Sequence, residues 1–190
     1  MNKESLKTKD LFSDPSTEKD ASDNDNNKLY LIITNISKPT NIKCLLRLAC
    51  AFGCSAIFVA GQRKFNFDPD APTSDIPNNL KAALKVMKVF QFDKLPECVE
   101  YVHSLGIQVV GVEIDESSVD IEHAEECFKG GSSTAFMMGN EGQGMNSKQM
   151  SLCDRFVKIS QYGGGTASLN VSVAAGIVLH RYHQWFLAQR

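Results

Sequence analysis

Two glycine-rich segments in the last third of the chain have the residue types and spacing of a small-molecule site. They span residues 139–144 and 163–165, and each follows a short apolar run. Glycine lets the backbone approach a ligand closely and adopt positive φ angles. The polar side chains in and after these segments are Asn140, Glu141, Ser168 and Asn170. Backbone groups combined with a few polar side chains are typical of a cleft that orients a small ligand.

The first segment does not match the common phosphate-binding patterns. Its glycines occupy the first, fourth and sixth positions and lie late in the chain, unlike those of a dinucleotide-binding fingerprint. No Gly-Lys-Ser or Gly-Lys-Thr follows, which excludes a P-loop. Taken alone, the segment also fits a plain turn between a strand and a helix.

Apolar periodicity predicts the elements that position these segments. Residues 134–138 and 155–159 are predicted strands that lead into the two segments, and a closing helix is predicted from Ser168 to Gln184 or beyond. Further strands are expected at 29–34, 55–60, 86–90 and 107–114. Further helices are expected at 41–53, 79–85, 93–104 and 146–153. Residues 115–131 are polar with weak helical character. This alternation predicts an α/β domain with a mostly parallel sheet flanked by helices.

The amino-terminal segment differs in composition from the rest. Residues 1–28 contain five lysines, seven acidic residues and few large apolar ones, so we expect a disordered tail before one domain at 29–190. The whole chain has 190 residues and a formal charge of −2, and the part after the tail is near neutral. It lacks the strongly basic composition of many nucleic-acid-binding proteins, so RNA binding would need a local patch or a symmetric partner.

Cysteine usage and hydropathy bear on metal binding, membrane association and the cellular compartment of the protein. The six cysteines form no Cys-x-x-Cys pair and have no histidine at ligand spacing, so we expect no metal. No apolar stretch is long enough to cross a bilayer, and we expect no membrane association. The absence of a secretory segment and of an Arg-rich transit peptide favours an intracellular protein, cytoplasmic or nuclear, with reduced thiols.

Three separated motifs together resemble the SpoU/TrmH family of RNA ribose 2′-O-methyltransferases, in the SPOUT superfamily. The first combines Pro39-Thr-Asn41 with Arg47 and Ala51-Phe-Gly53. The second is residues 136–144, and the third combines 157–161 with 168–175. The motifs occur in the family order, and the resemblance covers about residue 29 to the carboxyl end.

The resemblance implies a fold, a cofactor and partners. The carboxyl-terminal part would form a trefoil knot whose loops hold S-adenosyl-L-methionine, with S-adenosyl-L-homocysteine as the product and no metal. The family acts on RNA, not DNA, as a homodimer with the site near the subunit interface. The last helix, with Leu169, Val173, Ile177 and Trp185, would supply dimer contacts. From the residues alone, that helix can equally pack inside one subunit.

The resemblance also assigns roles to individual residues. The catalytic positions would be Asn41, Arg47, Glu141, Ser168 and Asn170. The cofactor-binding positions would be Met138, Gly139, Asn140, Glu141, Gly142, Ile159, Ser168 and Leu169. Three departures from the family pattern are Lys43, in place of a common glycine, Ser160, in place of a common proline, and Thr166-Ala167, where a glutamate is frequent.

Each assigned role has a structural alternative. Arg47 could form an ion pair, since a partly buried arginine is often simply paired. Glu141, Ser168 and Asn170 could serve only to cap helices. The candidates for RNA contact are Lys43, Arg47, Arg63 and Lys64, with Lys81 and Lys85 as further candidates. For the last four, a solvated surface is the alternative.

The resemblance predicts an S-adenosylmethionine-dependent methyltransferase acting on a ribose 2′-hydroxyl, with tRNA preferred over rRNA. A guanidinium with a pKa above about 12 is a poor base, so we expect Arg47 to grip a phosphate beside the ribose. The alternative is a non-catalytic RNA- or partner-binding homologue that retains the cofactor pocket.

Overall fold

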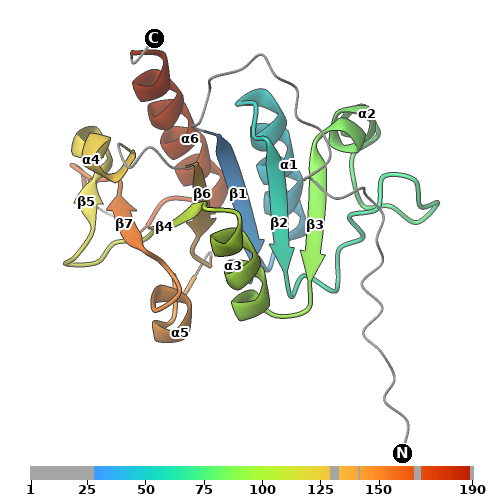
Figure 1. Cartoon of the computed structure of the whole chain (residues 1–190), viewed down its shortest axis with the longest axis horizontal. Helices are drawn as coiled ribbons and strands as arrows, with labels where there is room; N and C mark the ends of the chain where they lie inside the picture. The colour runs from blue at the N-terminus through green and yellow to red at the C-terminus, as the bar shows by residue number, and fades with distance from the viewer. Residues whose placement is uncertain (1–27, 129–132, 141, 165–167, 189–190) are drawn as a thin grey trace, which may run out of the picture.

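Seven strands form a single sheet in the computed structural model, which describes residues 28–128, 133–140, 142–164 and 168–188 (Figure 1). The strands are β1 Leu29–Thr34, β2 Ala56–Ala60, β3 Lys88–Phe92, β4 Gln108–Val112, β5 Val119–Asp120, β6 Thr134–Met138 and β7 Arg155–Lys158. The helices are α1 Pro39–Ala51, α2 Asn78–Val86, α3 Leu95–Ser104, α4 Glu125–Phe128, α5 Ser147–Met150 and α6 Val171–Leu187, with a 3-10 turn at Ile121–His123.

Every strand pair in the sheet is parallel, in the order β3-β2-β1-β6-β4-β7-β5. Leu31 of β1 is in register with Ile57 on one side and with Phe136 on the other. Because the strands are parallel, their carboxyl ends share one edge, and ligands bind outside that edge in open α/β sheets. β1, β2 and β3 form one half of the sheet, and β4 to β7 form the other half, with β6 next to β1. The carboxyl ends of the neighbouring strands β6, β4 and β7 therefore lie side by side.

Helices cover both faces of the sheet (Figure 1). One apolar cluster joins the sheet to α1, α2 and α6, with Leu45, Leu84 and Val178 among its buried side chains. A second cluster joins the other face to α3, where Cys98 and Val102 are fully buried. Strands covered on both faces read as continuous apolar runs, and β1, β2 and β6 have that pattern. The predicted parallel α/β architecture is confirmed.

Local signals account for where the two helices nearest the site begin. α1 starts at Pro39, whose fixed φ suits the first turn of a helix. α6 starts after Asn170, whose side chain accepts a hydrogen bond from the Ser172 amide at 2.9 Å. Asn170 therefore caps α6, and this does not exclude a second role.

The segment predicted as weakly helical differs most from its prediction. It contains β5, where Val119 is in register with Val157, followed by a 3-10 turn and the four-residue α4. Two residues are too short to show a period, and their pairing partner lies more than thirty positions later, so local patterning cannot reveal the strand. The predicted tail lies outside the described residues apart from Lys28. Within the described ranges, no helix has the length and apolarity needed to cross a bilayer.

Candidate functional site

A pocket of about 310 Å³ lies at the carboxyl ends of β4, β6 and β7. Its walls come from three loops and the first turn of α6. The loop after β4 contributes Val112, Glu113 and Ile114, and the first glycine loop contributes residues 138–140 and 142–144. The remaining lining residues are Lys158, Ile159, Gln161, Ser168, Leu169, Val171 and Ala174. The first glycine-rich segment therefore borders the cavity. Of the second segment, Gly163 and Gly164 are not among the lining residues, although Gln161 before it and Ser168 after it are, and Gly165 lies outside the described residues.

Asn140 organises the first glycine loop. Its side-chain oxygen accepts a hydrogen bond from the Gly142 amide at 3.0 Å, and its backbone pairs with that of Gly144 in both directions at 3.0 and 3.1 Å. Its side-chain amide donates to the Asn35 carbonyl at 2.7 Å and to Ser37 Oγ at 3.2 Å. The loop is thus closed on itself and attached to the connection between β1 and α1.

The loop after β7 is attached to the sheet edge through Ser160. Its hydroxyl donates a hydrogen bond to Asp120 Oδ2. This bond is the main reason why the pKa of Asp120 is lowered, followed by the hydrogen bond from the Glu122 amide. Beyond this anchor, Gln161 lines the pocket and Tyr162 is 91% exposed.

The first and third motifs meet at the start of α6. The Asn170 side-chain amide donates to Asn41 Oδ1 at 3.2 Å, and Asn41 is buried in the first turn of α1. Neither Asn41 nor Asn170 lines the pocket. The two residues that precede Asn170 in the chain, Ser168 and Leu169, do line it. The link fixes the direction in which the chain leaves the pocket and enters α6.

Most of the predicted cofactor-binding residues line the pocket. They are Met138, Gly139, Asn140, Gly142, Ile159, Ser168 and Leu169. Glu141, predicted for both catalysis and cofactor binding, lies outside the described residues. Residues 165–167, the last glycine and the two residues after it in the second segment, lie outside them as well.

Arg47 is not among the residues that line the pocket. It lies on the exposed side of α1, opposite the face that buries Leu45 and Leu46. No ion pair joins Arg47 to another described residue, so the structural alternative for it finds no partner in that part of the chain. The structure leaves this side chain free to meet a molecule outside the subunit.

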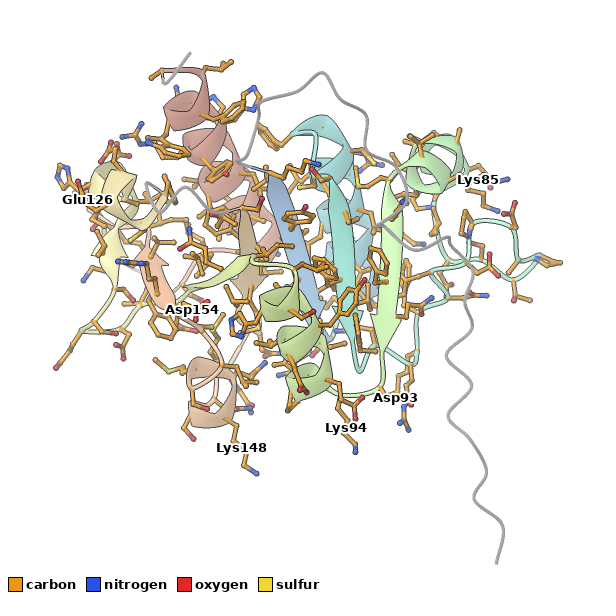
Figure 2. The ribbon with its side chains drawn as sticks, in the orientation of Figure 1. Lys85, Asp93, Lys94, Glu126, Lys148 and Asp154 are labelled. Carbon is orange, nitrogen blue, oxygen red and sulfur yellow. The ribbon has the colours of Figure 1, made fainter. Side chains whose placement is uncertain are left out.

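The other RNA candidates are dispersed. Lys43 is half-buried on α1, and Lys64 is exposed in the loop after β2. Arg63 is exposed beside Asp93, with 3.3 Å between Nη2 and Oδ1. Lys85 pairs with Asp70. Figure 2 shows Lys85 beside α2 and Asp93 near the end of β3, the strand at one edge of the sheet. These basic residues do not form one cluster with the pocket.

Among the lining residues to which the sequence assigned no role are three polar ones, Glu113, Lys158 and Gln161. Glu113 directly follows β4 and Lys158 ends β7, positions where a charged residue resembles ordinary surface. Lys158 and Gln161 lie in the third motif, but the resemblance gives them no role. Gln161 Oε1 is buried and finds no donor among the described residues. The signal that could have found all three is their position, because each lies at or within three residues of the carboxyl end of a strand.

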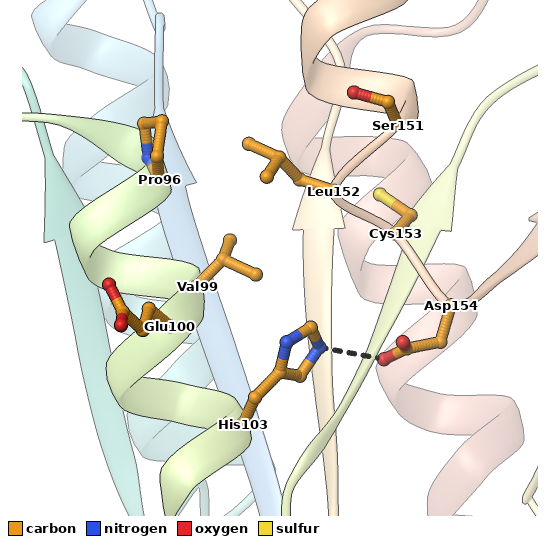
Figure 3. A pocket seen from close by; sticks show the side chains of 8 residues that line it. All are labelled: Pro96, Val99, Glu100, His103, Ser151, Leu152, Cys153 and Asp154. Carbon is orange, nitrogen blue, oxygen red and sulfur yellow. Dashed lines mark hydrogen bonds and ion pairs between the residues drawn. The ribbon is translucent and has the colours of Figure 1, made fainter.

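A second cavity, of about 300 Å³, lies between α3 and residues 151–154 (Figure 3). His103 Nε2 is 3.0 Å from Asp154 Oδ2, and that carboxylate also accepts a hydrogen bond from the Val109 amide at 2.7 Å. Burial raises the pKa of the neighbouring Cys153 thiol to about 12, so it is a poor nucleophile at neutral pH. The His–Asp pair joins α3 to the start of β7, on the face opposite α1 and α6. The described residues contain no cluster of three His, Cys, Asp or Glu side chains that could hold a metal ion.

These features define a class: a parallel α/β domain with a pocket formed by loops at the carboxyl edge of its sheet. The chain belongs to the SpoU rRNA Methylase family, whose model matches residues 28–180. The family predicted from three motifs is thereby confirmed.

Relatives of known name are similar over most of the chain. It is 31% identical over 153 residues to the 23S rRNA (guanosine-2′-O-)-methyltransferase RlmB of Photobacterium profundum, covering 80% of this chain and 58% of that protein. It is 30% identical over 165 residues to the human mitochondrial rRNA methyltransferase 1, covering 82% and 45%. The chain therefore spans about half the length of the relatives that it matches.

Solved structures share the fold. The AdoMet-bound rRNA methyltransferase from Sinorhizobium meliloti superposes with a TM-score of 0.68 at 22% identity, over 83% of this chain and 56% of that one. The SpoU methyltransferase AviRb from Streptomyces viridochromogenes gives 0.66 at 23% identity, over 86% and 61%. Both neighbours share the α/β fold of this chain, and the carboxyl-terminal knot stays a prediction.

Proposed function

We propose that this protein transfers a methyl group from S-adenosyl-L-methionine to a ribose 2′-hydroxyl of RNA. The observation that carries the proposal is the single pocket built from the second and third motifs, with Asn41 of the first motif bonded to Asn170 beside it. The names of the relatives support the same chemistry, since they describe guanosine 2′-O-methylation of rRNA.

The pocket suits the cofactor chemically. Met138, Ile159, Leu169 and Val171 provide apolar surface for the adenine ring, and the glycine loop offers backbone hydrogen-bonding groups for its edge. The buried Gln161 Oε1 supplies an acceptor for a ligand N–H group. Lys158 and Glu113 place opposite charges on the wall, which matches a ligand that carries both a carboxylate and cationic groups.

The residues of this chain would bind, align and exclude water. Methyl transfer from a sulfonium is an in-line displacement, and alignment of the two reactants contributes up to about 7–11 kcal/mol in favourable cases. Ser168 at the pocket mouth and Asn170 behind it would orient the ribose, and Glu141 would assist at the first loop. Arg47 would grip the flanking phosphate and favour the ionised hydroxyl, and the proton would leave to solvent.

We propose that the active protein is a homodimer, because Arg47 is exposed and does not line the pocket of its own chain. The exposed side of α6 carries Val173 and Ile177, which are 51% and 36% exposed. Apolar residues on the outside of a helix beside α1 fit a symmetric interface. A second copy packed there would bring a second Arg47 towards the pair of pockets.

The proposal also has to name the class of RNA that is methylated, rRNA or tRNA. The motifs favour tRNA as the substrate, whereas the names of the relatives describe rRNA methyltransferases. A fold neighbour at 19% identity concerns 2-OH methylation of C/U34 on tRNA, which speaks for the fold alone. We therefore propose rRNA as the first substrate to test, with tRNA as the comparison.

The direct test is incubation of the full chain with methyl-labelled cofactor and separate rRNA and tRNA fractions from cells that lack the protein. We expect label in one fraction and loss of transfer in Ser168→Ala. Cofactor binding without transfer to either RNA would support the non-catalytic homologue instead.

A further inference from the structure

Glu113 occupies a special position in the pocket. It follows β4 directly, is half-buried, and lines the cavity beside the first glycine loop. Its Oε2 accepts a hydrogen bond from the Met145 amide at 2.6 Å, and its Oε1 accepts one from the Ile114 amide at 2.9 Å. One carboxylate thus connects the loop after β4 with the end of the glycine loop, 32 residues later.

The glycine loop is shaped around this carboxylate. A Cβ atom at Gly139 would lie 2.8 Å from Glu113 Oε2, and a Cβ atom at Gly144 would overlap the same carboxyl group. Gly144 also has φ +64°, which side chains rarely adopt. Two of the three glycines in the loop are therefore explained by a close approach to Glu113, rather than by a close approach to a ligand.

The negative charge of Glu113 has no cationic partner among the described residues. None of the ion pairs in that part of the chain includes Glu113. Lys158 also lines the pocket, but it lies near Asp115 and Asp120. Hydrogen bonds are the main cause of the lowered pKa of these two carboxyl groups, and the charge of Lys158 is a smaller cause. The carboxylate of Glu113 is thus available to interact with a positive charge in the cavity.

The methyl transfer changes the charge of the bound cofactor. The bond between sulfur and the methyl carbon breaks, the bond between that carbon and the ribose oxygen forms, and the hydroxyl proton leaves to solvent. The sulfonium takes both electrons of the broken bond and becomes a neutral thioether. The amino and carboxylate groups of the cofactor are the same before and after the reaction, so donor and product differ by one positive charge.

Resting on the proposed function, we infer that Glu113 makes the pocket prefer the cationic methyl donor over its neutral product. The carboxylate attracts the sulfonium, and this attraction ends when the methyl group leaves. Glu113 is a positioning residue as well, because its two hydrogen bonds hold the loop that forms the wall. A glutamine removes the charge and keeps one acceptor oxygen, so it retains one of the two hydrogen bonds. Loss of the other hydrogen bond should affect every ligand alike, whereas loss of the charge should affect the cationic ligands alone.

The test is calorimetric titration of the full chain with S-adenosyl-L-methionine, S-adenosyl-L-homocysteine and sinefungin, an analogue with a cationic amine in place of the sulfonium. In Glu113→Gln we expect weaker binding of both cationic ligands by roughly three- to tenfold, the scale of an interaction between partly solvated charges. Binding of S-adenosyl-L-homocysteine should weaken clearly less than binding of the two cationic ligands, because it loses no attraction to the sulfonium and is affected only through the loop. Glu116→Gln, an exposed acid of the same loop that does not line the pocket, is the matched control and should change none of the three.

Equal weakening of all three ligands in Glu113→Gln would show that the residue only shapes the loop, and no change at all would remove it from recognition. Either result overturns the inference and leaves the proposed function standing. If the wild-type chain binds none of the ligands, the proposed function fails too. A measurement without any variant guards against misfolding: in the wild type, the preference for donor over product should shrink as salt is raised. A preference that is absent, or that salt does not alter, overturns the inference.

Discussion

The side-chain amide of Asn170 donates a hydrogen bond to Asn41 Oδ1 across a distance of 3.2 Å, joining residues 129 positions apart in the chain. One end of this bond is the first turn of α1, and the other is the N-cap of α6. The cap orients α6, and the bond to Asn41 fixes α6 against α1. Since Ser168 and Leu169 line the pocket just before the cap, the same contact positions one wall of the site.

Two substitutions separate the roles of Asn170. Asn170→Ala removes the cap and the bond to Asn41, and should lower the free energy of unfolding by about 1–3 kcal/mol. Asn170→Asp keeps an acceptor for the Ser172 amide and loses the donor to Asn41, so its cost should be clearly smaller. Urea unfolding measures both, and equal losses in the two variants would contradict the separation.

Gly144 should tolerate no side chain. Gly144→Ala would force a Cβ atom into the Glu113 carboxyl group at a backbone with φ +64°, and we expect a loss of about 1–3 kcal/mol together with weaker cofactor binding. Gly163→Ala is the control, because no atom lies within 4 Å of its Cβ position and its φ is not positive. Thermal unfolding and calorimetry check both variants, and a neutral Gly144→Ala would contradict the account of the loop.

Sequence patterns predicted the fold well because its elements are locally encoded. The buried runs of β1, β2 and β6 and the apolar faces of α1 and α6 are each legible within a dozen residues. β5 was missed because a two-residue strand exists only through its pairing with β7. Glu113 was missed for the same kind of reason: its role depends on glycines 26 and 31 positions away, and a lone acid after a strand resembles any solvated carboxylate.

The motif residues were predicted unevenly. Resemblance to the family assigned seven pocket residues that the structure does bring together. It also grouped Arg47 with them, and within one chain this residue faces outward. Spacing along a sequence cannot tell whether a helix presents a side chain to its own subunit or to another, because both arrangements leave the same periodicity.

Mixed dimers test whether Arg47 acts across an interface. Arg47→Ala and Ser168→Ala should each be inactive as homodimers. If Arg47 serves the pocket of the other subunit, co-refolding equal amounts should restore about a quarter of wild-type activity, since half of the dimers contain one intact site of two. An inactive mixture would place Arg47 in the site of its own chain or outside the mechanism.

Acid stability should depend on Asp120. Its pKa is lowered in the folded protein, mainly by the hydrogen bond from Ser160 and then by that from the Glu122 amide. A lowered pKa means that the unfolded chain takes up a proton more readily, so this contribution is complete above the usual Asp pKa of about 3.9 and is lost as the pH falls further. When the pH is lowered from neutral to below about 4, the free energy of unfolding of Asp120→Asn should therefore decrease less than that of the wild type.

Ser160→Ala is the companion variant for this prediction. It removes the main cause of the lowered pKa of Asp120 and leaves the carboxylate. Its loss of stability at acid pH should therefore lie between the losses of the wild type and of Asp120→Asn. Melting temperatures across a pH series measure all three proteins. Parallel curves for the three would show that the Ser160–Asp120 contact does not contribute to acid stability.

The location of the cofactor is the central claim, and a crystal structure of the full chain with S-adenosyl-L-homocysteine tests it most directly. We expect ligand density against the first glycine loop, Ile159 and Leu169, with the ligand's carboxylate near Lys158 and its sulfur near Glu113. Density in the other cavity, beside His103 and Asp154, with an empty pocket at the carboxyl ends of β4, β6 and β7, would contradict it.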